Sequence, residues 1–154
     1  MVLRDKMQIN RPPEIVWHFI ADQDLLQLWN ARIKAIVPVS QGRLVEGFRC
    51  RMRYDMQGKE SNFLAEIMEY SEPLKLVIHL TGGNLPLGGY AQEVYELSKS
   101  GEGTVLRQNI GIHNSGINAL LRCFMVSRHR FFRPAREKYV KRLKELVEKS
   151  KEES

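Results

Sequence analysis

The stretch FRCRMRYDM, residues 48–56, alternates without a break between apolar and charged side chains. Successive residues of a strand point to opposite faces of a sheet, so this period of two predicts a strand with one dry and one wet face. A sheet of such strands must cover its dry face with another layer. The chain therefore has to supply partner strands and a large covering element. The apolar positions are Phe48, Cys50, Met52, Tyr54 and Met56.

Five further segments between residues 31 and 113 are predicted to be strands that accompany this one. Clusters of Gly, Pro, Ser and Gln separate them and mark turns. Because the connections are short, neighbouring strands should run antiparallel. The predicted strands are 31–39, 60–70, 74–81, 89–97 and 104–113.

The segment before residue 31 is predicted to hold a strand over residues 2–10 and then two short helices. Pro12 and Pro13 suit the first turn of a helix, and Asn10 is placed to cap it. Asp22 is placed to cap the second helix, whose apolar side ends at Trp29. Two helices therefore follow the first strand.

After Gly116 the apolar positions return at helical spacing and continue to about residue 149. An uninterrupted helix of this length would measure roughly 50 Å, and Pro134 should kink or break it. This amphipathic segment is the element large enough to cover the sheet. We expect one domain over residues 1–149 and a charged tail, residues 150–154, that frays.

Several functional classes have no support in the composition. The two cysteines are far apart and the four histidines show no metal-binding spacing, so we expect no metal and no cofactor. No apolar run reaches the roughly 18 residues of a membrane span, and the N-terminus lacks the apolar core of a secretory signal. We therefore expect a cytoplasmic protein. The net charge of +6 favours anionic partners without identifying one.

Four motifs in a fixed order resemble the START-like superfamily, which is also called the polyketide cyclase/dehydrase or Bet v 1-like group (SRPBCC). They are RPPEIVWHFIADQDLLQLW at 11–29, EYSEPLKLV at 69–77, Gly-x-Gly-Thr at 101–104 and VKRLKELVEK at 140–149. The resemblance covers nearly the whole chain. It implies an α+β helix-grip fold, in which a seven-stranded curved antiparallel sheet surrounds a long C-terminal helix, with two short helices after the first strand.

The resemblance also implies a ligand cavity between the sheet and the C-terminal helix. Members bind lipids, sterols, hormones or polyketides, and a minority catalyse cyclisation, aromatisation or dehydration. Tyr54, Tyr95 and Gln108 could add polar groups to an apolar wall, although Tyr90 and Gln92 offer the opposite phase for the strand of Tyr95. The same residues could equally fill a core. The candidate ligand-binding residues are Phe48, Met52, Tyr54, Phe63, Ile67, Leu76, Ile78, Tyr95, Gln108, Ile110, Phe124, Arg128 and Phe131.

The basic stretch SRHRFFRPAR, residues 127–136, divides when it is drawn on a helical wheel. At roughly 100° per residue, Arg128 falls in the apolar stripe of Phe124 and Phe131, whereas Arg130 and Arg133 lie opposite. The outward pair is typical of a solvated face, so we expect no nucleic-acid partner and no stable membrane insertion. An inward-facing Arg128 needs an acceptor to offset its desolvation. It either forms a structural ion pair, or its side chain snorkels to water, or it contacts an acceptor group of a ligand.

The loop TGGNLPLGG, residues 81–89, carries the apolar tip Leu85, Pro86 and Leu87 between glycines. Strand alternation places it at the same end of the sheet as the Gln57–Gly58 turn. It is either a lid over the cavity or a plain connector.

The sequence thus favours a protein that binds or carries a small hydrophobic molecule, lipid-, polyketide- or isoprenoid-like. The first alternative is an enzyme of the polyketide cyclase, aromatase or dehydrase type, in which Arg128 and the cavity tyrosines orient a ketone. The second is an interaction module that uses the basic outer face of the C-terminal helix. No nucleophile motif and no recognisable pair of carboxylates occurs, and His79 and His113 are conceivable acid–base groups that are more typical of structural positions.

Overall fold

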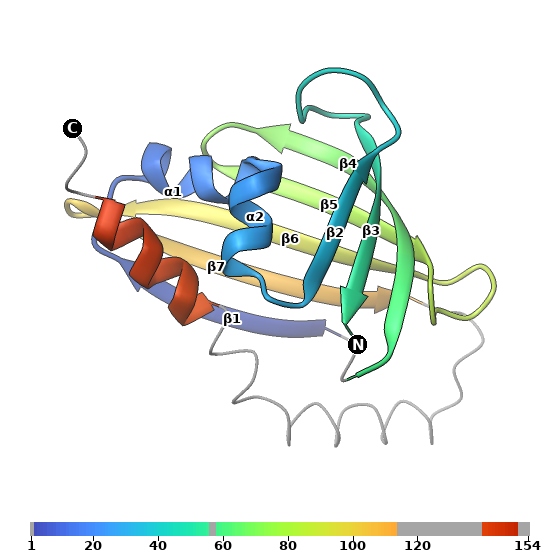
Figure 1. The fold of residues 1–154 in the computed structure, drawn as a ribbon. Helices are drawn as coiled ribbons and strands as arrows, with labels where there is room; N and C mark the ends of the chain where they lie inside the picture. The colour runs from blue at the N-terminus through green and yellow to red at the C-terminus, as the bar shows by residue number, and fades with distance from the viewer. Residues whose placement is uncertain (1, 56–57, 114–139, 151–154) are drawn as a thin grey trace.

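Seven antiparallel strands form one curved sheet in the computed structural model, which describes residues 2–55, 58–113 and 140–150 (Figure 1). The order across the sheet is β1-β7-β6-β5-β4-β3-β2, so β1 and β2 are its edges. Consecutive strands from β2 to β7 are neighbours because their connections are short. The strands are β1 (Val2–Ile9), β2 (Ile33–Pro38), β3 (Arg49–Asp55), β4 (Glu60–Ser71), β5 (Lys75–Gly82), β6 (Tyr90–Ser100) and β7 (Gly103–His113).

Each predicted strand is present, and the observed ends lie close to the predicted ones. The largest difference is in β6, which continues to Ser100 instead of ending at residue 97. Ser100 pairs with Gly103, so a two-residue turn joins β6 to β7. A feature that the alternation did not predict is an irregularity of register in β4 between Ile67 and Glu69. An extra residue at such a bulge bends the strand and increases its twist.

Two short helices, α1 (Pro13–Ala21) and α2 (Gln23–Trp29), follow β1 as predicted. The Asp22 carboxylate caps α2 by accepting hydrogen bonds from the backbone N–H groups of Asp24 and Leu25, at 2.9 and 3.0 Å. The prediction that Asn10 caps α1 is wrong. The N-cap position is Pro12, which has no side-chain cap, and the Asn10 N–H donates instead to Glu148 at 2.8 Å. Proline has no side-chain acceptor, so the first turn is closed instead by the Pro12 carbonyl, which accepts from the Ile15 and Val16 N–H groups at 3.1 and 3.3 Å.

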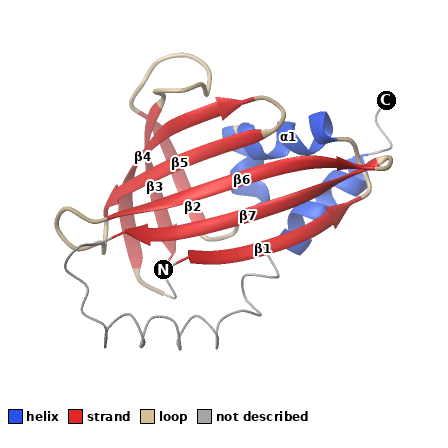
Figure 2. Ribbon diagram, turned by 180° about the vertical axis from the view of Figure 1, so that it is seen from behind, coloured by secondary structure: helices blue, strands red, loops and turns tan. Residues whose placement is uncertain are grey.

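The alternation in β3 separates its two faces as expected. Cys50, Met52 and Tyr54 are buried, whereas Arg49, Arg51 and Arg53 are exposed. We call the buried side the interior face. The helices lie over one face of the sheet, so the strands pass in front of parts of them when the molecule is seen from behind (Figure 2).

Residues 140–149 form a helix, which is the described end of the predicted C-terminal helix. Val140, Leu143 and Val147 are buried in the core at spacings of three and four residues, so one stripe of this helix faces the sheet. Residues 114–139, which include Pro134, and the tail after residue 150 lie outside the described residues. None of the described helices has the length and apolar character needed to cross a bilayer.

Both tryptophans, Trp17 and Trp29, lie in the core. The Trp29 indole N–H donates to the backbone oxygen of Phe19 at 2.9 Å, and its ring meets Tyr95 edge-on with centroids 6.4 Å apart. Trp17 meets Tyr70 edge-on at 5.2 Å. The two rings therefore fasten α1 and α2 to the interior face through large apolar contacts.

Truncation of the buried stripe on the C-terminal helix should destabilise the whole fold. Leu143 is fully buried, so Leu143→Ala should lower the free energy of unfolding by about 2–5 kcal/mol, as measured by urea titration. The exposed Lys149 of the same helix provides the control, because Lys149→Ala should change it by less than about 0.5 kcal/mol. A similar small change in both variants would show that this helix does not cover the core.

Candidate functional site

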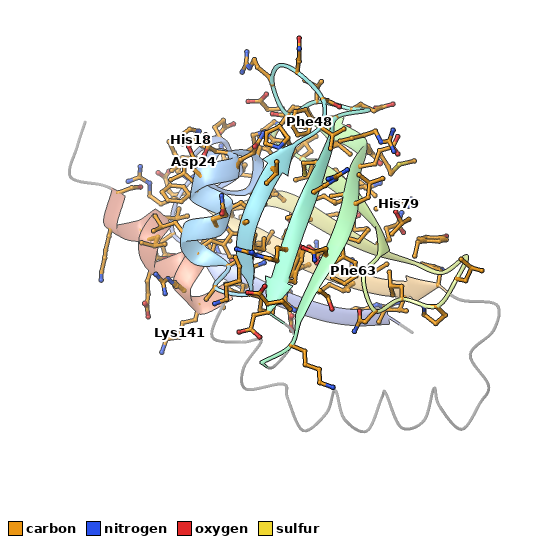
Figure 3. All side chains as sticks on the ribbon, turned by 45° about the vertical axis from the view of Figure 1, so that its right-hand side comes forward. His18, Asp24, Phe48, Phe63, His79 and Lys141 are labelled. Carbon is orange, nitrogen blue, oxygen red and sulfur yellow. The ribbon has the colours of Figure 1, made fainter. Side chains whose placement is uncertain are left out.

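The described residues that were predicted to line a ligand cavity are all buried. Cross-strand pairing shows that they share the interior face: Met52 pairs with Phe63, Ile67 with Ile78, and Leu76 with Tyr95. Figure 3 shows Phe48 and Phe63 towards opposite ends of the β3–β4 pair. The buried members of the predicted set are Phe48, Met52, Tyr54, Phe63, Ile67, Leu76, Ile78, Tyr95, Gln108 and Ile110.

A carboxylate lies inside this apolar wall. Glu93 is only 4% exposed, and its partners on the two neighbouring strands are Ile78 and Ile110. Removal of a carboxylate from water is costly unless hydrogen bonds replace the lost solvation. Glu93 is therefore the most unusual residue of the interior face, and its hydrogen-bond partners decide what it can do.

A chain of hydrogen bonds across two strands ends on Glu93. The Tyr95 hydroxyl donates to the Glu93 carboxylate at 2.9 Å, and the Gln108 amide donates to the Tyr95 oxygen at 3.1 Å. Tyr95 and Gln108 are directly opposite each other on β6 and β7, which fixes the second of these bonds. We call Glu93, Tyr95 and Gln108 the interior polar triad.

The phase of β6, which the sequence left open, is now settled. Glu93, Tyr95 and Leu97 are buried, whereas Tyr90 and Gln92 are half-buried on the opposite face. Tyr95 and Gln108 were among the ligand contacts predicted from the sequence, whereas Glu93 was not. The available signal was its spacing of two from Tyr95, which puts both side chains on the same face of a strand.

The charge of this carboxylate acts on two buried phenols, those of Tyr54 and Tyr95. Burial raises the pKa of both Tyr54 and Tyr95 well above the usual value of 10.0, and the negative charge of Glu93 raises both further. Arg32 opposes this shift at both phenols, so its guanidinium also acts on the same region. Both tyrosines consequently stay neutral near pH 7, where each can donate a hydrogen bond.

Arg32 comes from the connection between α2 and β2, whose backbone is held at both ends. The Arg32 backbone N–H donates to the Asn30 side-chain oxygen at 3.3 Å, and the Arg32 carbonyl accepts from the Asp55 backbone N–H at 2.7 Å. The fully buried Asn30 also caps α2 through its backbone N–H. This connection therefore places a basic side chain close to the acidic interior triad.

The buried thiol of Cys50 faces the same interior as Tyr54. Burial raises its pKa from 9.0 to about 11, so the thiol is protonated at neutral pH. A protonated, buried thiol is a weak nucleophile, and Cys50 serves as apolar wall.

The two histidines that were considered as acid–base groups do not join the triad. His79 and His113 stack on opposite sides of Tyr90, with ring centroids 4.8 and 4.7 Å away. The His79 ring also contacts the Gln92 side chain at 3.1 Å. This stack is built on the face of the sheet opposite the triad, so we assign it a structural role. No group of three or more potential metal ligands occurs among the described residues.

The predicted lid loop lies at the same end of the sheet as the β3–β4 connection, as expected (Figure 2). Leu85 is half-buried against the core, Pro86 is exposed and Leu87 is wholly exposed. At the base of the loop, Gly83 has a φ of 59° and lies against the ring of Phe63. The loop is therefore joined to the interior wall at Leu85 and Gly83, and its role as a lid stays a prediction.

Three predicted ligand contacts, Phe124, Arg128 and Phe131, lie outside the described residues. The partner of Arg128 therefore stays a prediction.

Two glycine variants can separate backbone strain from the contact with Phe63. A Cβ at Gly83 would lie 2.5 Å from the Phe63 ring, whereas a Cβ at Gly88 would meet nothing within 4 Å. Both positions have positive φ, so Gly88→Ala should cost about 1–2 kcal/mol through backbone strain alone. Gly83→Ala should lower the free energy of unfolding further, in the same urea titration, because the Phe63 ring must move. Equal losses would show that the contact with Phe63 does not hold the loop.

Solved structures of the same architecture cover almost the whole chain. A Thermus thermophilus protein, TTHA0849, matches at 18% identity with a TM-score of 0.76, over 98% of this chain and 99% of that one. A START superfamily protein from Mycobacterium smegmatis matches at 15% identity with a TM-score of 0.73, over 96% and 97%. The protein Ara h 8.0201 matches at 14% identity with a TM-score of 0.68, over 96% and 97%. Identities this low show the shared fold alone.

No curated protein matches this sequence significantly. The sequence model of one family, described as polyketide cyclase / dehydrase and lipid transport, matches residues 2–148. This match spans both the sheet and the C-terminal segment and agrees with the helix-grip arrangement of the structure. The chain therefore belongs to the polyketide cyclase / dehydrase and lipid transport family.

Proposed function

We propose that this protein binds a small hydrophobic molecule, lipid-, polyketide- or isoprenoid-like, against the interior face of the sheet. The interior polar triad holds the polar end of this ligand. The single observation that carries the proposal is the buried Glu93 carboxylate, hydrogen-bonded to Tyr95 within an apolar wall. Fold and family support the class of hydrophobic-ligand proteins, and the triad supplies the specific contact.

A ligand role explains the triad better than stability does. Well-packed apolar residues stabilise a core as much as buried charges do, or more, because they carry no desolvation cost. The register already sets Glu93 between two isoleucines, so an apolar residue there would continue the wall. A hydrogen bond from a polar group of a ligand would explain why a carboxylate is present at this position.

The hydrogen-bonding capacity of the triad defines the ligand group. A carboxylate accepts several hydrogen bonds, so Glu93 can accept one from a ligand hydroxyl or amine while it keeps the bond from Tyr95. The neutral Tyr54 phenol can donate to a ligand carbonyl. We therefore expect a mainly apolar molecule with a hydroxyl or keto group at its inner end.

A second function, of the polyketide cyclase or dehydrase type, is favoured by the same carboxylate and phenols. In a dehydration, Glu93 would take the proton from the carbon next to a ketone while Tyr54 hydrogen-bonds the ketone oxygen. The resulting carboxylic acid would return the proton to the departing hydroxyl, which leaves as water. The balance is the loss of one water, with Glu93 restored to its starting form.

Other parts of the functional hypothesis stay proposals. The interaction-module alternative rests on the basic outer face of the C-terminal helix, of which Arg130 and Arg133 lie outside the described residues. We propose a cytoplasmic location, no nucleic-acid partner and no stable membrane insertion, all of which rest on the sequence.

The binding role of Glu93 can be tested by native mass spectrometry of freshly purified protein. The wild-type protein should retain a small hydrophobic ligand, whose affinity should fall about 10- to 100-fold in Glu93→Gln, because one hydrogen bond to a charged acceptor is lost. The matched control is Glu96→Gln, which changes the same residue type on the other face of β6. Equal retention in all three proteins would contradict the proposal.

Incubation with the retained ligand separates the two functions. Binding without conversion identifies a carrier, whereas conversion that Glu93→Gln abolishes identifies an enzyme. If the Glu93→Gln variant still converts the ligand, Glu93 has no catalytic role in the conversion.

Arg128 can be tested on the same retained ligand. If Arg128 contacts a ligand acceptor, Arg128→Met should weaken binding about tenfold or more, measured by calorimetric titration. Unchanged affinity would assign Arg128 to a structural ion pair.

A further inference from the structure

A groove with a volume of about 850 Å³ runs along the edge of the sheet, between β1 and the C-terminal helix. Four consecutive residues of β1, from Arg4 to Met7, line it, so both faces of this edge strand contribute. Val140 and Lys141 contribute from the helix. Lys141 marks the start of this helix in Figure 3. The groove therefore lies beside the interior face and outside the polar triad.

Basic side chains dominate the described lining of this groove. There are five of them, against three acidic ones. One of the acids, Glu148, already contacts Lys144 at 3.8 Å and accepts the Asn10 N–H at 2.8 Å. The remaining lining is positive, which favours an anion. The basic residues are Arg4, Lys6, Arg107, Lys141 and Lys144.

The register of the β1–β7 pair concentrates this charge. Lys6 is directly opposite Arg107, and Arg4 lies two residues along the same face of β1. This is the outward face, because the adjacent Met7 and Gln108 face the interior. Like charges directly opposite in an antiparallel pair are destabilising. An anion between these side chains would turn that repulsion into attraction.

The shape and floor of the groove indicate a single amphiphilic molecule. A flat bilayer cannot enter a concavity, whereas a narrow molecule can lie along it. Met7 and Val140 form an apolar part of the lining, and Met7 pairs across the strands with the buried Leu106. The neighbouring Asp5 pairs with Gln108 of the interior triad. Asp5 and Met7 therefore stand on the interior face, and a chain that passes round the edge of β1 from the basic residues reaches that face.

We propose that this groove binds the anionic head, a carboxylate or a phosphate monoester, of a single-chain amphiphile. The basic side chains around Lys6 and Arg107 hold the head. The route of the apolar chain towards the interior rests on the proposed function, but the head site stands on the groove alone.

Calorimetric titration with four soluble probes tests this head site: decanoate, decyl phosphate, decanol and inorganic phosphate. The wild-type protein should bind decanoate and decyl phosphate about tenfold or more tightly than decanol, because each anion gains charge-assisted hydrogen bonds. In the triple variant Arg4→Gln/Lys6→Gln/Lys141→Gln this preference should disappear. The triple variant Arg51→Gln/Lys59→Gln/Lys99→Gln removes the same charge from exposed positions outside the groove and should keep the preference.

Three results would overturn the proposal. The first is equal affinity of the wild-type protein for decanol and decanoate. The second is inorganic phosphate binding as tightly as decyl phosphate, which would mean an ion site without an amphiphile. The third is a groove variant that loses binding to vesicles of phosphatidylcholine and phosphatidylglycerol while keeping its preference for decanoate, which would assign the basic residues to a membrane surface.

The head site and the interior triad can fail separately. Equal affinity of the wild-type protein for decanol and decanoate would overturn only the head site. An unchanged affinity of the retained ligand in Glu93→Gln would contradict only the proposed function. Thermal unfolding of each variant confirms that lost binding is not lost folding.

Discussion

The dry face of the sheet is the constraint on which the rest of this structure depends. Strands β3 to β7 each place apolar side chains on one side, and water must be kept from that side. α1 and α2 follow the edge strand β1 and pack back on this face through Trp17 and Trp29. The helix over residues 140–149 adds Leu143 and Val147 from the other end of the chain. The helix-grip arrangement is thus the burial of one apolar surface from both termini.

Period and turn chemistry were sufficient to predict the strands, because they are local properties of the sequence. The side chain of Glu93 escaped prediction because a charged residue in an alternating strand normally faces water, and Tyr90 and Gln92 offered a plausible opposite phase. Only pairing with β5 and β7, which sets Glu93 between Ile78 and Ile110, fixes its direction. Asn10 was misplaced as a cap because its actual contact, Glu148, is remote in sequence. The basic groove was not predicted for the same reason. Its lining residues come from β1, β7 and the C-terminal helix, which are far apart in the sequence.

The interior is apolar in composition but not uniform in electrostatics. Glu93 and two neutral phenols occupy it, and Arg32 acts on those phenols from its border. In a low-dielectric interior such groups interact more strongly than they do in water. The hydrogen bonds from Gln108 to Tyr95 and from Tyr95 to Glu93 hold these polar groups in fixed orientations. Under the proposed function, a ligand would meet an acceptor already oriented by its neighbours.

The opposite charges of the triad and the groove would orient an amphiphile between them. An anionic head pushed towards Glu93 would place two negative charges together away from water, and both repulsion and desolvation oppose this. The same head beside Lys6 and Arg107 removes an existing repulsion between the two cations. A neutral hydroxyl or keto end has no such penalty at Glu93 and can replace lost solvation there. Asp5 and Gln108 are paired across β1 and β7, so the two regions are neighbours, and a bound amphiphile would lie with its head outward and its neutral end inward.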